Sequence, residues 1–227
     1  ADGTYKAGDV ITINVVFSEA VIVTTTGGTP QLTLETGSTD QNASYSSGSG
    51  TTTLAFSYTV QAGDTASDLN YKATSSLALN GGTIKDAAGN SATLTLPAVD
   101  SSDSLAGNSA FVIDTTAPTF SSAATNTAGT KVILTYNEAL SATTAASSAF
   151  AVTTDGSANA VTAVAVSGST VELTLTKTVG SSQTVTVAYT DPSNANDNNA
   201  VQDSQGNDVA SLSSNAVTNN STRQIVQ

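Results

Sequence analysis

A small set of acidic and amide side chains recurs at the ends of apolar segments, and their chemistry suits a calcium ion. Glu19 follows a run of alternating apolar residues, Asp86 and Asn90 bracket a glycine-containing turn, and Asp114 directly follows the apolar segment 111–113. Calcium takes about six to eight oxygen ligands, which carboxylates and amide carbonyls supply. We therefore predict a calcium site formed by Glu19, Asp86, Asn90 and Asp114, where one β-rich unit ends and the next begins.

The same set of residues appears a second time. Tyr136–Leu140 repeats Phe17–Val21 as an aromatic, a small polar residue, Glu, Ala and an aliphatic, and Asp203–Asn207 repeats the turn Asp86–Asn90. The Glu precedes the Asp of the turn by 67 residues in the first copy and by 65 in the second. This agreement in type and spacing predicts an internal repeat. We expect the second set of ligands at the far pole of the second unit, able to meet a following module: Glu138, Asp203 and Asn207.

Each of these residues also has a simpler explanation. The pattern Asp-x-x-Gly-Asn is typical of a turn in which Asp accepts backbone hydrogen bonds and Gly or Asn takes a positive φ. Glu19 can end its strand toward water, and Lys85 can pair with Asp86. The metal interpretation is favoured because a Glu, a turn Asp and a connector Asp occur together with few basic residues nearby.

Composition narrows the classes of function. Eighteen acids against six bases give a net charge of −12, which disfavours nucleic acid and anionic membrane surfaces as partners. The chain has no His and no Cys, and no glycine-rich phosphate loop leads into a helix, so nucleophilic catalysis lacks its usual groups. We predict that the protein is not an enzyme. No apolar run approaches the roughly 18 residues of a membrane helix, and we expect a soluble, exported segment.

The elements that must position these residues are β-strands. Residues 10–17 alternate apolar and polar side chains, and 51–60 repeat the pattern more strongly, between turns rich in Gly, Asn, Asp and Ser. Further strands are predicted around 77–79, 93–96 and 110–113, and about five more in the second half, with a short helical turn within 141–149. We predict an all-β protein of two tandem Ig-like β-sandwich domains in line, residues 1–116 and 117–227, joined by a stiff connector around Pro118.

These motifs resemble extender repeats of large bacterial surface adhesins of the repeat-in-toxin type, which are Ig-like or cadherin-like modules. The resemblance rests on residues 1–11, 17–21, 79–90 and 112–118 and covers the first unit. The second unit resembles a repeat of cyanobacterial and marine surface proteins linked to swimming motility. The second unit ends in Ala216–Asn219, without the acid that ends the first.

The resemblance implies an extracellular, cell-surface protein whose linkers calcium makes rigid and which extends or presents an adhesive tip in cell adhesion or biofilms. Its partners would be neighbouring Ig-like modules of the same chain and a host or cell-surface ligand, with no nucleic acid and no membrane insertion, and we expect a monomer. The alternative is a ligand-binding module that recognises a peptide or glycan through the long polar loops 98–109 or 191–199.

Overall fold

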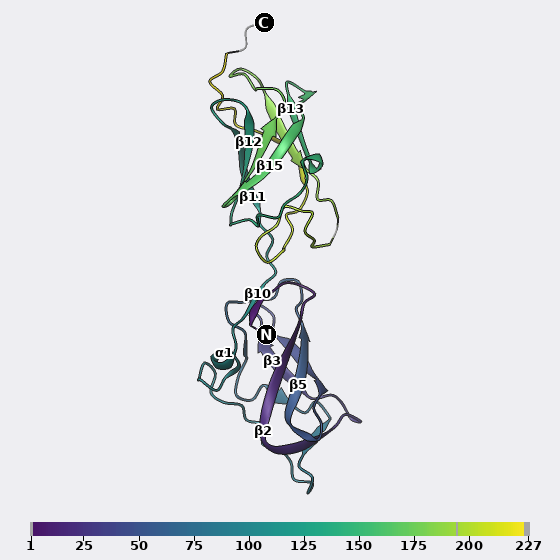
Figure 1. Ribbon diagram of the computed structural model, residues 1–227. Helices are drawn as coiled ribbons and strands as arrows, with labels where there is room; N and C mark the ends of the chain where they lie inside the picture. Colours follow the sequence, from purple (N-terminus) through teal and green to yellow (C-terminus); the bar gives the residue numbers. More distant parts are fainter. Residues whose placement is uncertain (1, 194, 225–227) are drawn as a thin grey trace. The chain divides into compact units, whose positions relative to one another are not determined.

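The computed structural model describes residues 2–193 and 195–224, and these form two compact units that divide between Thr115 and Thr116. The division falls one residue before the boundary expected from the sequence. Nearly all of the regular secondary structure in both units is β-strand (Figure 1), so the prediction of an all-β protein is confirmed. None of the described helices is long and apolar enough to cross a membrane.

Unit 1 contains two sheets. The larger has the order β7-β3-β4-β5-β2-β9, with β8 also paired to β3, and the smaller has the order β1-β10-β6. The strands are β1 (Gly3–Tyr5), β2 (Val10–Thr24), β3 (Gln31–Glu35), β4 (Gln41–Ser47), β5 (Thr51–Thr59), β6 (Thr65–Ala66), β7 (Asn70–Tyr71), β8 (Leu77–Ala78), β9 (Thr83–Lys85) and β10 (Phe111–Asp114).

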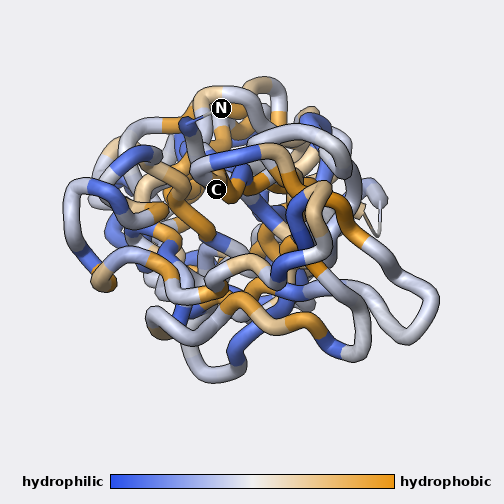
Figure 2. Tube along the Cα trace, turned by 90° about the horizontal axis from the view of Figure 1, so that it is seen from below, coloured by the Kyte–Doolittle hydropathy of each residue, from blue (hydrophilic) through white to orange (hydrophobic). Residues whose placement is uncertain are grey.

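The core of unit 1 follows the period of two seen in its sequence. Ile11 and Ile13 of β2 are buried, as are Leu54, Phe56 and Tyr58 of β5, while the residues between them face outward or are half-buried. Side chains on one face of a strand recur at every second residue, so each strand contributes one apolar face to a common core. Hydropathy accordingly changes over short distances along the chain (Figure 2).

Unit 2 is a sandwich of two four-stranded sheets, β11-β12-β16-β15 and β14-β13-β17-β18, which enclose one hydrophobic core. Its strands are β11 (Phe120–Thr125), β12 (Lys131–Tyr136), β13 (Phe150–Thr154), β14 (Ser157–Ala158), β15 (Val161–Ser167), β16 (Thr170–Leu175), β17 (Val185–Tyr189) and β18 (Leu212–Ala216). A two-residue turn joins β13 to β14, and both of its residues, Asp155 and Gly156, have positive φ. An Asp-Gly pair in this conformation matches the twist of a hairpin.

The two units share a parallel pairing between their first strand and their last segment. In unit 1, β1 runs parallel to β10, with Gly3 opposite Phe111. In unit 2, a parallel bridge joins Ala124 of β11 to Thr218, and the Thr218 N–H donates to the Ala123 carbonyl at 2.9 Å. This shared arrangement agrees with the internal repeat inferred from the sequence.

The structure departs from the predicted elements at three places. The predicted strand 93–96 is extended but forms no ladder, and β2 continues to Thr24, so Glu19 lies inside this strand. A short helix, α1 (Leu105–Asn108), occupies the loop 98–109, with the Ser104 hydroxyl accepting from the Gly107 N–H. The helical turn expected within 141–149, by contrast, is confirmed as the short 3₁₀ helix η1 (Ser147–Ala149).

Candidate metal centre

Glu138 is positioned by the segment that follows β12. Asn137 forms two hydrogen bonds with the chain segment that enters unit 2. Its side-chain carbonyl accepts from the Thr119 N–H at 2.6 Å, and its own N–H donates to the Thr119 carbonyl at 3.1 Å. Three residues after Glu138, the Ser141 N–H donates to the Gln202 carbonyl at 2.8 Å. These bonds hold the half-buried Glu138 beside the start of the turn Asp203–Asn207.

Asp203 organises that turn from within the protein. Only 1% of Asp203 is exposed. Its Oδ1 accepts from the N–H groups of Gln205 and Asn207 at 2.8 and 2.9 Å, and its Oδ2 accepts from the Asn207 side-chain amide at 2.8 Å. A carboxylate has about four acceptor positions, so these three bonds leave one position on Oδ2.

The structure brings Glu138 and Asp203 together. A carboxylate oxygen of each lies within 4.8 Å of the other. Two carboxylates at this separation repel each other, and a bound cation relieves that repulsion while using their oxygen atoms as ligands. Asn207, the third predicted ligand of the second set, is 2% exposed and belongs to the same turn. Glu138 and Asp203 therefore form a cluster in unit 2, and Asn207 is bonded to Asp203 through its side-chain amide.

The position of this cluster corrects one expectation. We predicted the cluster at the far pole of unit 2, but Tyr136 pairs with Phe120 at the start of β11, and Asn137 bonds to Thr119. Glu138 therefore lies at the pole where the chain enters unit 2. The reason is that its strand, β12, is the second of the unit and antiparallel to the first, so it returns to the entry pole.

In unit 1 the same turn is present in more open surroundings. Asp86 accepts from the Asn90 N–H and the Asn90 side-chain amide, both at 2.7 Å, which reproduces the bonds of Asp203. These bonds, led by the one from the Asn90 side chain, lower the pKa of Asp86 below its ordinary value. Asp86 is half-buried and Asn90 exposed, and no ion pair joins Lys85 to Asp86 among the described residues. The turn interpretation thus accounts for the contacts of Asp86.

Glu19 and Asp114 do not share a pole, contrary to our prediction. Val60 at the end of β5 bonds to Asp9 before β2, and the next turn bonds to Thr115, because the Gly63 N–H donates to the Thr115 hydroxyl at 3.0 Å. The start of β2 therefore lies near the end of β10, which carries Asp114. Glu19 is nine residues beyond the start of β2 and exposed, and a strand rises about 3.3 Å per residue. Glu19 and Asp86 belong to no group of three close acids in the described part of the chain.

Asp114, a predicted ligand, and Asn219, which stands where unit 2 lacks an acid, lie at the ends of their units. Asp114 is the half-buried last residue of β10, opposite Thr65 of β6. At the end of unit 2, Asn219 takes part in structural hydrogen bonds, because its side-chain amide donates to the carbonyls of Gly180 and Gln183, both at 2.8 Å. Nothing in the described segment 216–219 supplies a carboxylate for a metal at the end of unit 2.

Comparison with known proteins gives a partial match. Residues 113–194 match the model of a repeat described as "Putative flagellar system-associated repeat", which covers roughly a third of the chain. The search of curated proteins found no match. Among solved structures, the N-terminal part of the bacterial S-layer protein SbsC is 24% identical with a TM-score of 0.38, and the match covers 46% of this chain and 24% of that one.

Proposed function

We propose that this chain is a structural segment of a bacterial cell-surface protein and that calcium bound by Glu138 and Asp203 stiffens its connection. The observation that carries the proposal is the pair of carboxylates held within 4.8 Å of each other at the entry pole of unit 2. The match of residues 113–194 to a flagellar system-associated repeat supports a role at the bacterial surface. In this role the segment extends or presents an adhesive tip and catalyses no reaction.

Asp114 is the further ligand that the chain itself can supply. It precedes Thr119, which is bonded to Asn137 beside the pair, by five residues. A fully extended chain spans at most about 3.6 Å per residue, so the connector keeps Asp114 within about 18 Å of Thr119. In the proposed site, Asp114 binds the ion together with Glu138 and Asp203, and Asn207 adds an amide oxygen.

The energetics fit an extracellular ion. Three carboxylates repel each other in the absence of a cation, so the apo connector gains nothing from bringing them together. Extracellular calcium modules bind with a Kd of roughly 10⁻⁴ to 10⁻³ M, which millimolar external calcium fills and cytosolic calcium does not. Binding to the folded state alone also raises its stability by mass action.

Isothermal titration calorimetry on the full chain tests the proposal. We expect calcium to bind the parent in the range given above and Glu138→Gln to weaken binding about tenfold or more, because it removes a charged ligand. Asp68→Asn is the matched control, since Asp68 is an exposed acid of unit 1 and its loss changes the net charge equally. A parent that binds no calcium, or an Asp68→Asn variant that loses binding as Glu138→Gln does, would contradict the proposal.

The variant Asp114→Asn tests whether the calcium site includes a ligand from the connector. If Asp114 is a ligand, this variant binds calcium more weakly, and small-angle scattering of the parent shows a broader range of dimensions after chelation. If Asp114→Asn binds as the parent does while Glu138→Gln does not, the ion belongs to unit 2 alone and the stiffening proposal fails.

A further inference from the structure

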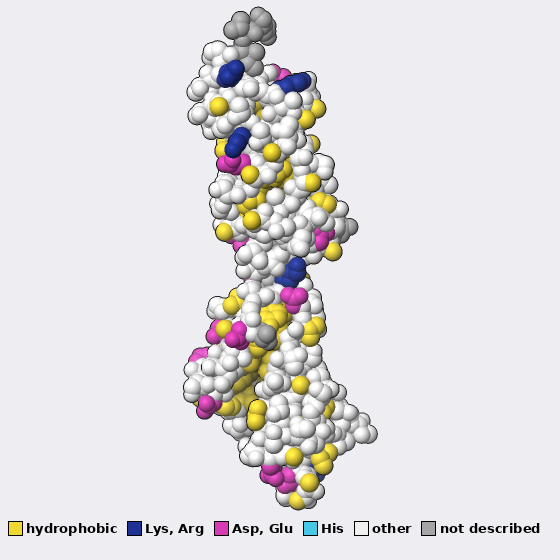
Figure 3. All heavy atoms as spheres, in the orientation of Figure 1, with side chains coloured by type: hydrophobic (Ala, Val, Ile, Leu, Met, Phe, Trp, Pro, Cys, Tyr) yellow, Lys and Arg dark blue, Asp and Glu magenta, His cyan; other side chains and the backbone are white. Residues whose placement is uncertain are grey.

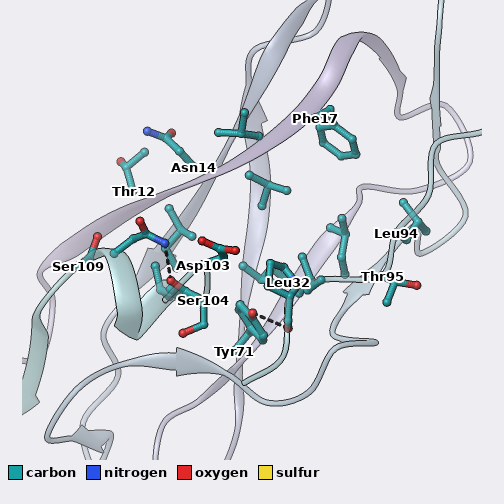
Figure 4. Close-up of a pocket in the computed structure, with 18 of the residues that line it drawn as sticks. Thr12, Asn14, Phe17, Leu32, Tyr71, Leu94, Thr95, Asp103, Ser104 and Ser109 are labelled. Carbon is teal, nitrogen blue, oxygen red and sulfur yellow. Dashed lines mark hydrogen bonds between the residues drawn. The ribbon is translucent and has the colours of Figure 1, made fainter. Parts of the chain in front are cut away.

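Unit 1 has an open groove on the side of β2 that faces away from β5. Its volume is about 570 Å³, and its lining includes residues 12–17 of β2, the segment 93–97, the buried Leu32 and Tyr71, and 103–105 at the start of α1. Figure 3 shows hydrophobic side chains along this hollow, and Figure 4 shows Thr12, Asn14 and Phe17 on one wall with Leu94 and Thr95 on the other. The groove uses none of the residues of the proposed metal site.

The wall formed by β2 is an unpaired sheet edge. In the described chain, residues 10–16 of β2 pair with β5, and β9 pairs with β2 only at residues 22–24. The Val60 N–H donates to the Asp9 carbonyl at 2.9 Å, which fixes the alternation of the ladder. Because backbone groups of an antiparallel strand point alternately to either side, the N–H and C=O groups of the even residues point away from β5. These residues are Val10, Thr12, Asn14 and Val16.

The opposite wall is nearly a strand. Leu94 and Leu96 are half-buried, while Thr93, Thr95 and Pro97 are exposed, which is the alternation that predicted a strand here. Instead of joining a ladder, the segment is tied to its surroundings by single bonds: the Leu96 N–H donates to the Thr74 carbonyl at 2.8 Å, and the Tyr71 hydroxyl donates to the Pro97 carbonyl at 2.7 Å. The groove is therefore bounded by two extended segments that do not pair with each other.

We propose that this groove binds an extended segment of a partner protein, which adds as a strand to the free edge of β2. Strand addition obtains affinity from main-chain hydrogen bonds and specificity from pockets for alternate side chains. The exposed edge of β2 offers the main-chain groups, and the alternating half-buried Leu94 and Leu96 beside a hollow of about 570 Å³ offer the contacts for side chains. Val16, which is 72% exposed on β2, adds an apolar surface beside the edge.

Charge favours a partner with a basic residue over a second copy of this chain. The one charged residue lining the groove is Asp103, which is exposed near α1. A copy of this protein carries a net charge of −12, and like charges of this size oppose association. The predicted occupant therefore has apolar side chains at alternate positions and a Lys or Arg at the end near Asp103.

The test measures binding of a fluorescein-labelled peptide, alternating valine and threonine between terminal lysines, to the full chain by fluorescence anisotropy. Asn14→Pro removes an N–H that points into the groove, and proline is tolerated on such an edge. We expect it to weaken binding about tenfold, the equivalent of one lost hydrogen bond. Asn14→Ala, which keeps the N–H, should bind like the parent. Equal binding by the proline variant, at an unchanged melting temperature, would overturn the proposal.

Modified peptides keep the test valid if Asn14→Pro fails to fold. N-methylation of alternate amides along the edge that faces β2 should abolish binding, whereas methylation along the other edge should spare it; equal tolerance of both would indicate a nonspecific apolar pocket and refute strand addition. Asp103→Asn should weaken the lysine peptide about threefold, as expected of an exposed ion pair, and an unchanged affinity would refute the charge preference.

Two controls assign the outcome to the groove. Sedimentation that shows concentration-dependent dimers, dissociated by the peptide, would replace the partner with a second copy and so contradict the proposal. Glu138→Gln should bind the peptide as the parent does, since Glu138 lies in unit 2 and the groove in unit 1. Loss of calcium binding with retained peptide binding would thus separate the two proposals.

Discussion

Asp86 and Asp203 close the same turn in different surroundings. Each accepts from the backbone and the side-chain amide of an Asn four residues later, at 2.7 to 2.9 Å. Asp203 is 1% exposed, whereas Asp86 is half-buried. A buried N–H group that loses a charged acceptor lowers the stability of the fold, whereas an exposed N–H group can bond to water instead. The same substitution should therefore have different effects in the two turns.

We predict that Asp203→Ala, measured by urea unfolding in chelator, lowers the free energy of unfolding of unit 2 by about 3 kcal/mol, because buried N–H groups lose a charged acceptor. Asp86→Ala should have a smaller effect on unit 1. Asp203→Asn retains one acceptor and should recover part of the loss. Equal losses in the two turns would mean that burial does not determine their contribution.

The hydrogen bonds of Asp155 predict how stability changes at acidic pH. Bonds from the Thr184 N–H, the Gln183 side chain and the Thr184 hydroxyl, in that order of importance, lower the pKa of Asp155 below its ordinary value of 3.8. A lowered folded-state pKa gives stability that is present above the unfolded-state pKa and is lost as the pH falls through the folded-state pKa. Asp155→Asn should therefore be less stable than the parent at neutral pH, and the difference should begin to shrink below roughly pH 4 and vanish once the pH is below the folded-state pKa.

The measurement is urea unfolding of parent and variant at a series of pH values. Asn is a suitable replacement because Asp155 has a φ of +50°, a conformation that Asn tolerates. A difference in stability that persists unchanged into acid would show that the charge of Asp155 does not contribute.

At the scale of elements, two loops of unit 1 meet backbone to backbone next to β9. A Cβ built on Gly81 would lie 2.3 Å from the Gly27 carbonyl oxygen, whereas a Cβ on Gly63 would meet nothing within 4 Å. The two glycines have φ values of +87° and +93°, so an alanine at either position has a similar backbone cost. A comparison of the two variants isolates the effect of the close contact.

We predict that Gly63→Ala destabilises unit 1 by about 1 to 2 kcal/mol through its backbone conformation, and Gly81→Ala by about 3 kcal/mol or more because the loops must separate. Thermal unfolding followed by circular dichroism measures both. Equal losses would mean that the loops move apart without cost.

The alternation of apolar residues was sufficient to predict most strands, because β2, β5, β12 and β16 each bury one face. It failed at 93–96, where burial alternates but no neighbour completes a ladder, since pairing depends on the rest of the sheet. The alternation also did not reveal that a strand, β11, precedes the strand that leads to Glu138 in unit 2. The repeat was enough to predict that Glu138 and Asp203 lie together. The end of unit 2 at which they lie could be found only from the register of β11 and β12.

At the scale of the whole molecule, charge must be distinguished from calcium. Eighteen acids and six bases give a net charge of −12, and the compact state is destabilised by this repulsion. Any salt screens it, so a rise in stability on adding calcium is not by itself evidence of a site. Sodium at the same ionic strength reproduces the screening and provides no ligand-specific binding.

We predict that calcium at about ten times its Kd stabilises unit 2 by about 1.4 kcal/mol beyond sodium at equal ionic strength, as mass action requires. Differential scanning calorimetry of the parent and Glu138→Gln measures this difference, and the variant should respond to both salts alike. Unit 1 should also respond alike, because its Glu19 and Asp86 belong to no group of three close acids among the described residues. If calcium and sodium stabilise the parent equally, its acids interact with cations only through screening.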